Sequence, residues 1–251
     1  MSRPAFVLLP PSESKVSGGR LPTATGYFDE SLATAREQVR AALASLLRDA
    51  SPEEVSRVLK VRGALLERAV ASSRLIVEGV APTLPAWQRY SGVVWSHLEP
   101  LTLSEEQRSR VLIPSGLYGL STGTDEIADY RLTMKVNLGD LGNVASFWRP
   151  TLARALEGID GATFVNLLPK EHDGAMRLAT LQQERILTVS FLRHGGEGIA
   201  GHDAKAVKGV VARRVLDEGL EAVDGFRWKG WRGRIHRGHH EVRAPRGDHS
   251  Q

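Results

Sequence analysis

Residues 113–134 read IPSGLYGLSTGTDEIADYRLTM and bring hydroxyl, phenol, carboxyl and guanidinium groups into one short stretch. An apolar run at 111–113 leads into it, and two glycines, Gly116 and Gly119, lie close to either side of Tyr118. Glycines at this spacing favour a tight loop that exposes the backbone and can direct Tyr118 into a cleft. The pattern predicts a strand end, a functional loop and a returning segment.

Arg131 is the polar residue of this stretch that most strongly indicates binding. A guanidinium forms paired hydrogen bonds with carboxylate or phosphate groups, so we expect Arg131, next to Tyr130, to hold an anion. The alternative is an ion pair with Asp125 or Glu126 that fastens the loop.

Composition excludes several classes of protein. The chain has 251 residues, of which 41% are apolar and 25% charged, as in soluble globular proteins. It has no cysteine, which excludes disulfide frameworks, thiolate zinc sites, iron–sulfur clusters and cysteine nucleophiles. The apolar run at 5–9 is too short for a signal peptide or a membrane span, so we expect a cytoplasmic protein without membrane contact.

Positive charge is concentrated at the C-terminal end. Residues 227–251 contain seven Lys/Arg and two Asp/Glu, a net charge of +5, whereas the whole chain carries +4. Arginines interleaved with Trp228 and Trp231 suit phosphate contacts and stacking on bases. The favoured interpretation is a flexible, solubilising tail. We therefore expect an α/β domain over 1–226 and a basic, flexible tail over 227–251.

Three apolar runs, at 5–9, 163–168 and 185–192, predict buried strands. Ser12 and Lys15 follow the first strand, which Pro10-Pro11 ends, and Asn166 lies within the second. Ligands bind beyond the carboxyl ends of strands in open α/β sheets. We therefore expect a mixed α/β fold with a central mixed sheet and flanking helices, in which these side chains meet Ser115 and Tyr118; the alternative for Lys15 is a solvated loop.

An early helical insertion is predicted over about 29–71. Apolar residues recur three and four apart over 29–49, and Ser51-Pro52-Glu53-Glu54 is a strong signal for a second helix start. Two short helices joined around 60–63 would form a hairpin. Its backbone amides can face a DNA phosphate, although plain helical packing is the alternative.

Two later helices are also predicted. One spans 141–156, where Pro150 indicates two helical pieces. The other follows Gly201 and places Lys205 and Lys208 on one stripe near its N-terminus, where they add positive potential. The sequence contains no zinc-ligand spacing, P-loop, dinucleotide fingerprint or GxSxG motif, so we expect no metal site and the cofactor stays unidentified.

Several motifs together carry a family resemblance. They are LLPPSESK (8–15), SGLYGL (115–120), DYRLTM (129–134), FW (147–148), VNLLPKEH (165–172), VSF (189–191), KAVKGVVARR (205–214) and DGF (224–226). In this order, across about 6–226, they resemble the YaaA family of cytosolic peroxide-stress proteins. The resemblance implies a single compact α/β fold with a helix-hairpin-helix element, DNA binding, and a role in limiting oxidative damage when intracellular iron is high.

The resemblance also identifies site positions by motif. They are Lys15, Ser115, Tyr118, Tyr130, Arg131, Trp148, Asn166, Glu171, Lys205, Lys208 and Arg213. The chain departs from the family pattern at Ser121-Thr122-Gly123, where an Arg-Pro pair is usual, and YSGVVW (90–95) lacks a common Lys and Asp. These departures leave open a specialised member with an altered substrate.

Two classes of function follow. The first is a DNA-binding stress protein whose hairpin and basic tail contact phosphates without sequence preference. The second is an enzyme for a small anionic or nucleotide-like substrate. In it, Lys15, Arg131 and Lys208 hold charge and Tyr118 or Glu171 moves a proton. A structural partner protein, recognised by a large exposed apolar patch, is a third alternative.

Overall fold

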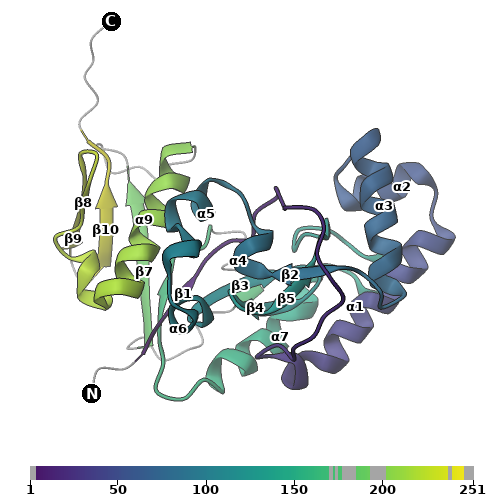
Figure 1. Cartoon of the computed structure of the whole chain (residues 1–251), viewed down its shortest axis with the longest axis horizontal. Helices are drawn as coiled ribbons and strands as arrows, with labels where there is room; N and C mark the ends of the chain where they lie inside the picture. The colour runs from purple at the N-terminus through teal and green to yellow at the C-terminus, as the bar shows by residue number, and fades with distance from the viewer. Residues whose placement is uncertain are drawn as a thin grey trace, which may run out of the picture.

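A mixed sheet forms the centre of the computed structural model, which describes residues 4–169, 172, 175, 176, 185–192, 202–236 and 239–245 (Figure 1). The sheet has eight strands among these residues, in the order β4-β3-β1-β6-β7-β10-β9-β8. Five adjacent strands are parallel: β3 (Val111–Ser115), β1 (Ala5–Leu8), β6 (Thr163–Asn166), β7 (Ile186–Leu192) and β10 (His239–Arg243). The predicted mixed α/β fold with a central mixed sheet is confirmed.

Antiparallel strands close both edges of this sheet. They are β4 (Gly119–Thr122) beside β3, and β9 (Trp231–His236) and β8 (Arg227–Trp228) beyond β10. A second, two-stranded sheet pairs β2 (Thr83–Pro85) with β5 (Glu126–Ala128). Because the five central strands are parallel, their carboxyl ends lie along one edge, where the loop after β1 begins.

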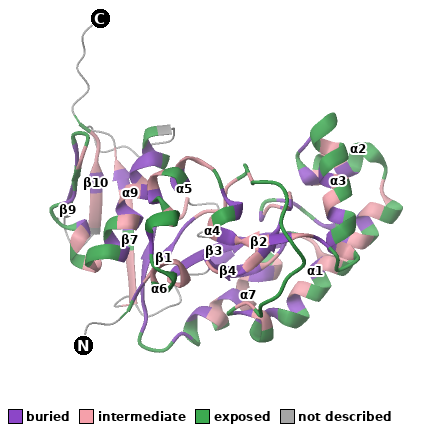
Figure 2. Cartoon of the chain, in the orientation of Figure 1, coloured by how far each residue is buried: buried purple, intermediate pink, exposed green. Residues whose placement is uncertain are grey.

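Apolar composition fixes β1 in the middle of the sheet. Its register pairs Leu8 with Leu112 on one side and with Asn166 on the other. β1 and β3 are almost fully buried (Figure 2), as expected for strands covered on both faces. Pro10 and Pro11 follow directly, and because proline has no N–H group it cannot continue a central ladder.

Helices pack against the sheet and against each other. They are α1 (Asp29–Asp49), α2 (Pro52–Leu59), α3 (Ala64–Val77), α4 (Ala86–Arg89), α5 (Val93–Leu98), α6 (Glu105–Ser109), α7 (Val144–Glu157) and α9 (His202–Glu218), with 3-10 turns η1 (Pro100–Thr102), η2 (Gly139–Leu141) and η5 (Leu220–Val223). α9 packs against α5 and β1, and α7 contacts α1 and β4. No helix among the described residues is both long and apolar enough to cross a membrane.

The predicted early helical hairpin is present. α1 has the predicted bounds and buries Leu32, Val39 and Leu43 along one face. The Ser51 hydroxyl accepts a hydrogen bond from the backbone N–H of Glu54 and caps α2. α2 and α3 are joined by residues 60–63, and α1 to α3 lie at the end of the molecule opposite β8 to β10 (Figure 1).

The predicted break at Pro150 is wrong. α7 continues through Pro150 to Glu157 and starts at Val144, after an Asn143 side chain that accepts a hydrogen bond from the Ser146 N–H at 3.0 Å. A proline inside a helix removes one backbone hydrogen bond. Here the buried face of α7, which includes Trp148, Leu152 and Leu156, supplies packing energy on both sides of the proline.

The C-terminal region differs from the flexible tail expected over 227–251. Its described part forms β8, β9 and β10 of the central sheet. In β9, Trp231 and Gly233 are buried whereas Arg232 and Arg234 are exposed, which is the alternation of a strand with one covered face. The sequence did not reveal this two-residue period, because the exposed alternate positions of the strand are occupied by arginines. Residues 246–251 lie outside the described part of the chain.

Substitution of Trp231 tests the role of these strands. Because Trp231 is 5% exposed, we expect Trp231→Ala to lower the free energy of unfolding by about 3–5 kcal/mol in urea titrations. Its exposed neighbour provides the control, since Arg232→Ala should change that energy by no more than about 0.5 kcal/mol. Equal stability of the two variants would show that the C-terminal strands do not contribute to the folded domain.

Gly209 permits the close contact of α9 with α5. A Cβ atom there would overlap the carbonyl oxygen of Val94 and lie 2.8 Å from the Cβ of His97. We expect Gly209→Ala to destabilise the protein by about 1–3 kcal/mol, despite the better helix propensity of alanine. Gly158→Ala is the control: a Cβ there meets its nearest atom at 3.5 Å. A thermal melt that ranks Gly209→Ala as equally or more stable would contradict this packing.

Candidate functional site

Lys15 lies in the loop beyond β1 and is held there by backbone contacts. The loop forms a bridge between Lys15 and Tyr90. On either side, the Val16 N–H donates to the Arg89 carbonyl at 2.8 Å and the Ser91 N–H donates to the Ser14 carbonyl at 3.2 Å. These contacts fix the position of the Lys15 side chain at the carboxyl edge of the sheet.

Two tyrosine rings and one carbonyl surround the Lys15 amine. The nitrogen lies 4.3 Å from the ring centroid of Tyr130 and 5.5 Å from that of Tyr90. It also donates a hydrogen bond to the carbonyl oxygen of Ser12 at 2.8 Å. Aromatic faces attract cations at these distances. The contact assigns Ser12 a positioning role through its backbone.

The pKa of Lys15 is lowered to about 7, mainly by burial and secondly by the nearby Arg131 guanidinium. The carboxylates of Asp129 and Glu13 oppose this shift. Desolvation makes the largest contribution to the lowered pKa. Removal of water disfavours the charged form of an amine. A large fraction of Lys15 is therefore neutral at physiological pH and able to accept a proton.

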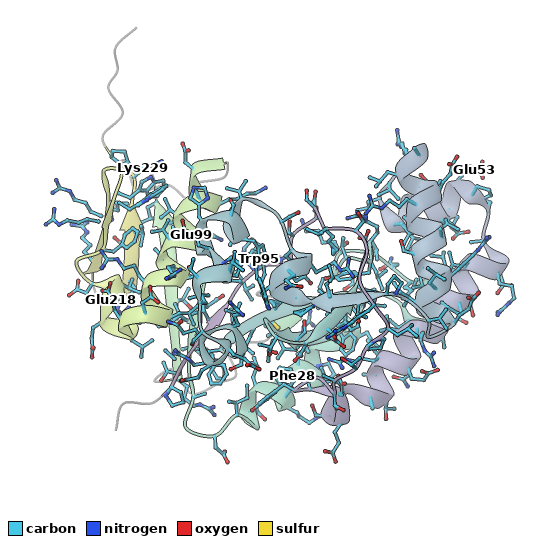
Figure 3. All side chains as sticks on the ribbon, viewed as in Figure 1. Phe28, Glu53, Trp95, Glu99, Glu218 and Lys229 are labelled. Atoms are coloured by element: carbon cyan, nitrogen blue, oxygen red, sulfur yellow. The ribbon has the colours of Figure 1, made fainter. Side chains whose placement is uncertain are left out.

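The two tyrosines form one hydrogen-bonded unit. Their hydroxyl oxygens, on Tyr90 and Tyr130, are 2.6 Å apart. Burial raises the pKa of both phenols, and the Ser115 hydroxyl also hydrogen-bonds to Tyr130. Both phenols therefore stay protonated at neutral pH. Tyr90 also stacks at 4.9 Å on the ring of Trp95, a core residue labelled in Figure 3.

The loop that carries Tyr118 is tightly fixed. The backbone N–H of Tyr118 donates to the Ser115 hydroxyl at 3.1 Å, and the Tyr118 hydroxyl accepts a hydrogen bond from the Ala128 N–H at 2.8 Å. Gly119 has a positive φ of 70°, and a Cβ there would collide with the ring of Trp148. Burial raises the pKa of Tyr118. Its ring meets Tyr130 edge-on at 5.6 Å, so Tyr118 supports the site as a protonated, anchored phenol.

Arg131 is paired with a different carboxylate from the two that the sequence suggested as its ion-pair partners. Its guanidinium donates to the carbonyl oxygen of Glu13 and lies 3.5 Å from a carboxylate oxygen of Asp129. The predicted alternative partners are used elsewhere. Asp125 accepts the Thr122 hydroxyl at 2.6 Å, and Glu126 accepts the Thr23 N–H at 2.7 Å. An ion pair that fastens the loop is therefore present, but its carboxylate is that of Asp129.

Lys208 and Asn166 lie along the same sheet edge. The Lys208 amine is 5.4 Å from the ring of Phe191, near the carboxyl end of β7. Asn166 is the last residue of β6, is buried, and accepts the Leu168 N–H at 3.0 Å. β6 lies between β1 and β7 in the sheet, so the ring that the Lys208 amine faces belongs to a strand two places from β1.

Two other predicted site residues, Lys205 and Arg213, are not brought into this cluster. Lys205 is exposed on α9. Arg213 lies further along α9, where it pairs with Asp217 at 2.6 Å and donates to the Thr102 hydroxyl; its guanidinium is used for surface packing because α9 turns it toward η1. Glu171 lies outside the described residues.

Sequence analysis missed two charged residues beside the site. Asp129 precedes Tyr130 directly, and this adjacency was the available signal. Arg89 is completely buried, and its guanidinium donates to the carbonyls of Ile127, Gly18, Pro82 and Val16. No short-range pattern marks such a residue, because its partners come from distant segments. It connects the 16–18 segment to β5 and to the residue before β2.

Two cavities lie beside the cluster. The larger, about 360 Å³, is lined by Tyr118, Arg36, Leu117 and Ile127 among others. The smaller, about 220 Å³, is lined by Arg68, Asp129 and the 17–18 turn. Lys15 and Arg131, both within the described chain, line neither of them. A ligand would reach Lys15 from its partly exposed side.

Comparisons with known proteins agree with the family resemblance. A family described as peroxide stress protein YaaA matches residues 6–234. A UPF0246 protein of Streptomyces coelicolor is 32% identical over 222 residues, covering 85% of this chain and 84% of that protein. A UPF0246 protein of Corynebacterium efficiens is 31% identical over 227 residues, covering 87% of each. The chain therefore belongs to the peroxide stress protein YaaA family.

Proposed function

We propose that the chain binds a small anionic or nucleotide-like ligand beside Lys15 and acts on it, with the Lys15 amine as proton acceptor. One observation carries the proposal: Lys15 is enclosed by two tyrosine rings beside an arginine and has a pKa of about 7. A base is most effective when its pKa lies near the working pH. A lysine kept only for surface charge needs no such enclosure.

The surrounding groups suit an anion. Arg131 supplies a fixed positive charge beside Lys15. Lys208, which the sequence placed in the same site, lies against Phe191 of β7. Tyr118 was an alternative proton carrier in the sequence, but its hydroxyl is anchored to Ala128 and its pKa is raised. The proposal therefore assigns proton transfer to Lys15, and Glu171 stays a prediction.

Lysine labelling at different pH values tests the state of the amine. Because the folded pKa is about 7, Lys15 loses its proton as pH rises through 7, and its labelling by an amine-reactive reagent should inflect there. Peptide-resolved mass spectrometry measures this rate. A rate that keeps rising to pH 9 and beyond, as for a solvated lysine, would contradict the lowered pKa.

The same labelling tests ligand binding. We expect adenosine monophosphate, as a nucleotide-like anion, to slow labelling of Lys15 at pH 7.5. Arg131→Gln should reduce that protection about tenfold or more in apparent affinity, because a charge-assisted hydrogen bond is lost. Arg154→Gln, at an exposed position on α7, is the matched control. If adenosine monophosphate and inorganic phosphate both leave Lys15 labelling unchanged, the anion site is refuted.

We also propose DNA binding through the helical hairpin, as a second function. The turn between α2 and α3 exposes Lys60, Arg62 and Gly63. Gly63 is the N-cap of α3 and has no side chain with which to cap its first amides, so these donors can meet a phosphate. The exposed arginines of β8 and β9 supply further positive charge. A role in limiting peroxide and iron-dependent damage is proposed on the basis of family membership.

Salt dependence tests the hairpin. We expect the Lys60→Gln, Arg62→Gln double variant to weaken binding to duplex DNA and to reduce the slope of log affinity against log salt by about 2, one for each lost phosphate contact. Fluorescence anisotropy at several salt concentrations measures both. Arg48→Gln is the control, because Arg48 is exposed on α1 and paired with Asp49. Wild-type affinity that does not fall with rising salt would exclude phosphate-driven binding.

A further inference from the structure

We propose that Asp129 is a positioning residue that links helix α3 of the hairpin to the Lys15 site through ion pairs with Arg68 and Arg131. The inference rests on the proposed role of Lys15 and deepens it by naming a route for its regulation. Its basis is a chain of contacts between two regions that the sequence places far apart.

The contacts run from α3 to the backbone of Glu13, in the loop that carries Lys15. One Asp129 carboxylate oxygen lies 2.7 Å from an Arg68 guanidinium nitrogen, and the other lies 3.5 Å from the Arg131 guanidinium. Arg131 in turn binds the carbonyl of Glu13, two residues before Lys15. Asp129 and Arg131 side chains are each 14% exposed, so solvent screens this pair less than a surface pair.

Asp129 is shared unequally between its two partners. The oxygen that faces Arg131 is buried and makes no hydrogen bond with any described residue. It is held by charge alone, whereas the other oxygen has a full hydrogen bond to Arg68. Loss of the Arg68 contact would free the carboxylate to turn toward Arg131. A buried carboxylate oxygen without a hydrogen bond favours such a change.

A cavity lies beside this ion pair, between α3 and the 17–18 turn. About 220 Å³ of space separates Ala71 and Leu75 of α3 from the 17–18 turn, and Arg68 and Asp129 line the same cavity. Packed side chains would transmit a movement of α3 by contact, but a cavity does not. Arg68 lies five residues after Gly63 in the same helix, so displacement of the hairpin turn also moves its guanidinium.

A movement of Asp129 would change the pKa of Lys15, because several charged groups surround the amine. Arg131 and Arg89 lower the pKa of Lys15, whereas Asp129 and Glu13 raise it, beside the neutral phenols of Tyr90 and Tyr130. Any rearrangement of Asp129 therefore alters the balance of charge at Lys15. An event at the hairpin would in this way change how readily Lys15 accepts a proton.

The pH profile of Lys15 labelling tests the link, because a purely structural role for Asp129 would not move it. We expect Asp129→Asn to lower the inflection by about 0.5 pH unit or more, since an anion is removed. Arg68→Gln should raise it, since the Asp129 charge is then less compensated. Arg214→Gln is the control: it breaks an exposed ion pair with Glu218 on α9 and should leave the inflection unchanged.

Folding is checked by thermal melts, and Arg68→Gln keeps the test decisive if Asp129→Asn fails to fold, because the Arg68 side chain is 48% exposed. An unchanged inflection in folded Arg68→Gln would overturn the link. The outcome is separable from the proposed ligand site. If neither adenosine monophosphate nor inorganic phosphate gives protection but the inflection shifts, the link stands and the ligand proposal fails. Protection without a shift overturns the link.

Discussion

Parallel pairing of β1 with β3 and β6 is the constraint on which the site depends. It places the end of β1 between two buried strands, so the chain must leave the sheet at Pro10 and cross its carboxyl edge. The 14–16 segment then pairs with residues 89–91, which carry Tyr90. Without that register, Lys15 would not meet a ring that comes from a distant helix.

Burial, more than charge, gives Lys15 its chemistry. Two tyrosine faces remove water from the amine but supply only weak compensation for a full charge. Asp129 and Glu13 would hold a proton on the amine, yet Asp129 is itself paired with two arginines. The site therefore keeps a charged arginine beside an amine that need not be charged.

Sequence patterns predicted what local periodicity determines. They identified the apolar strands, the bounds of α1, the Ser51 cap of α2 and the loop around Tyr118, because each depends on neighbours within about ten residues. They failed where the structure depends on contacts between segments far apart in the sequence. The strands after Arg227 were concealed by their charged face, α7 continues through Pro150 because of its packing, and Arg89 and Asp129 obtain their partners from other elements.

The departure at Ser121-Thr122-Gly123 has a structural counterpart. Ser121 and Thr122 are buried in β4, and a Cβ at Gly123 would overlap the carbonyl of Arg108, so this strand leaves no room for a long cationic side chain. A guanidinium still reaches the loop: Arg36 of α1 donates to the carbonyls of Tyr118 and Leu120. These hydrogen bonds occupy the N–H groups of the Arg36 guanidinium and hold the loop backbone in place. Arg36 is therefore not available as a substitute for the missing family arginine, and the proposed anion site depends on Arg131 beside Lys15.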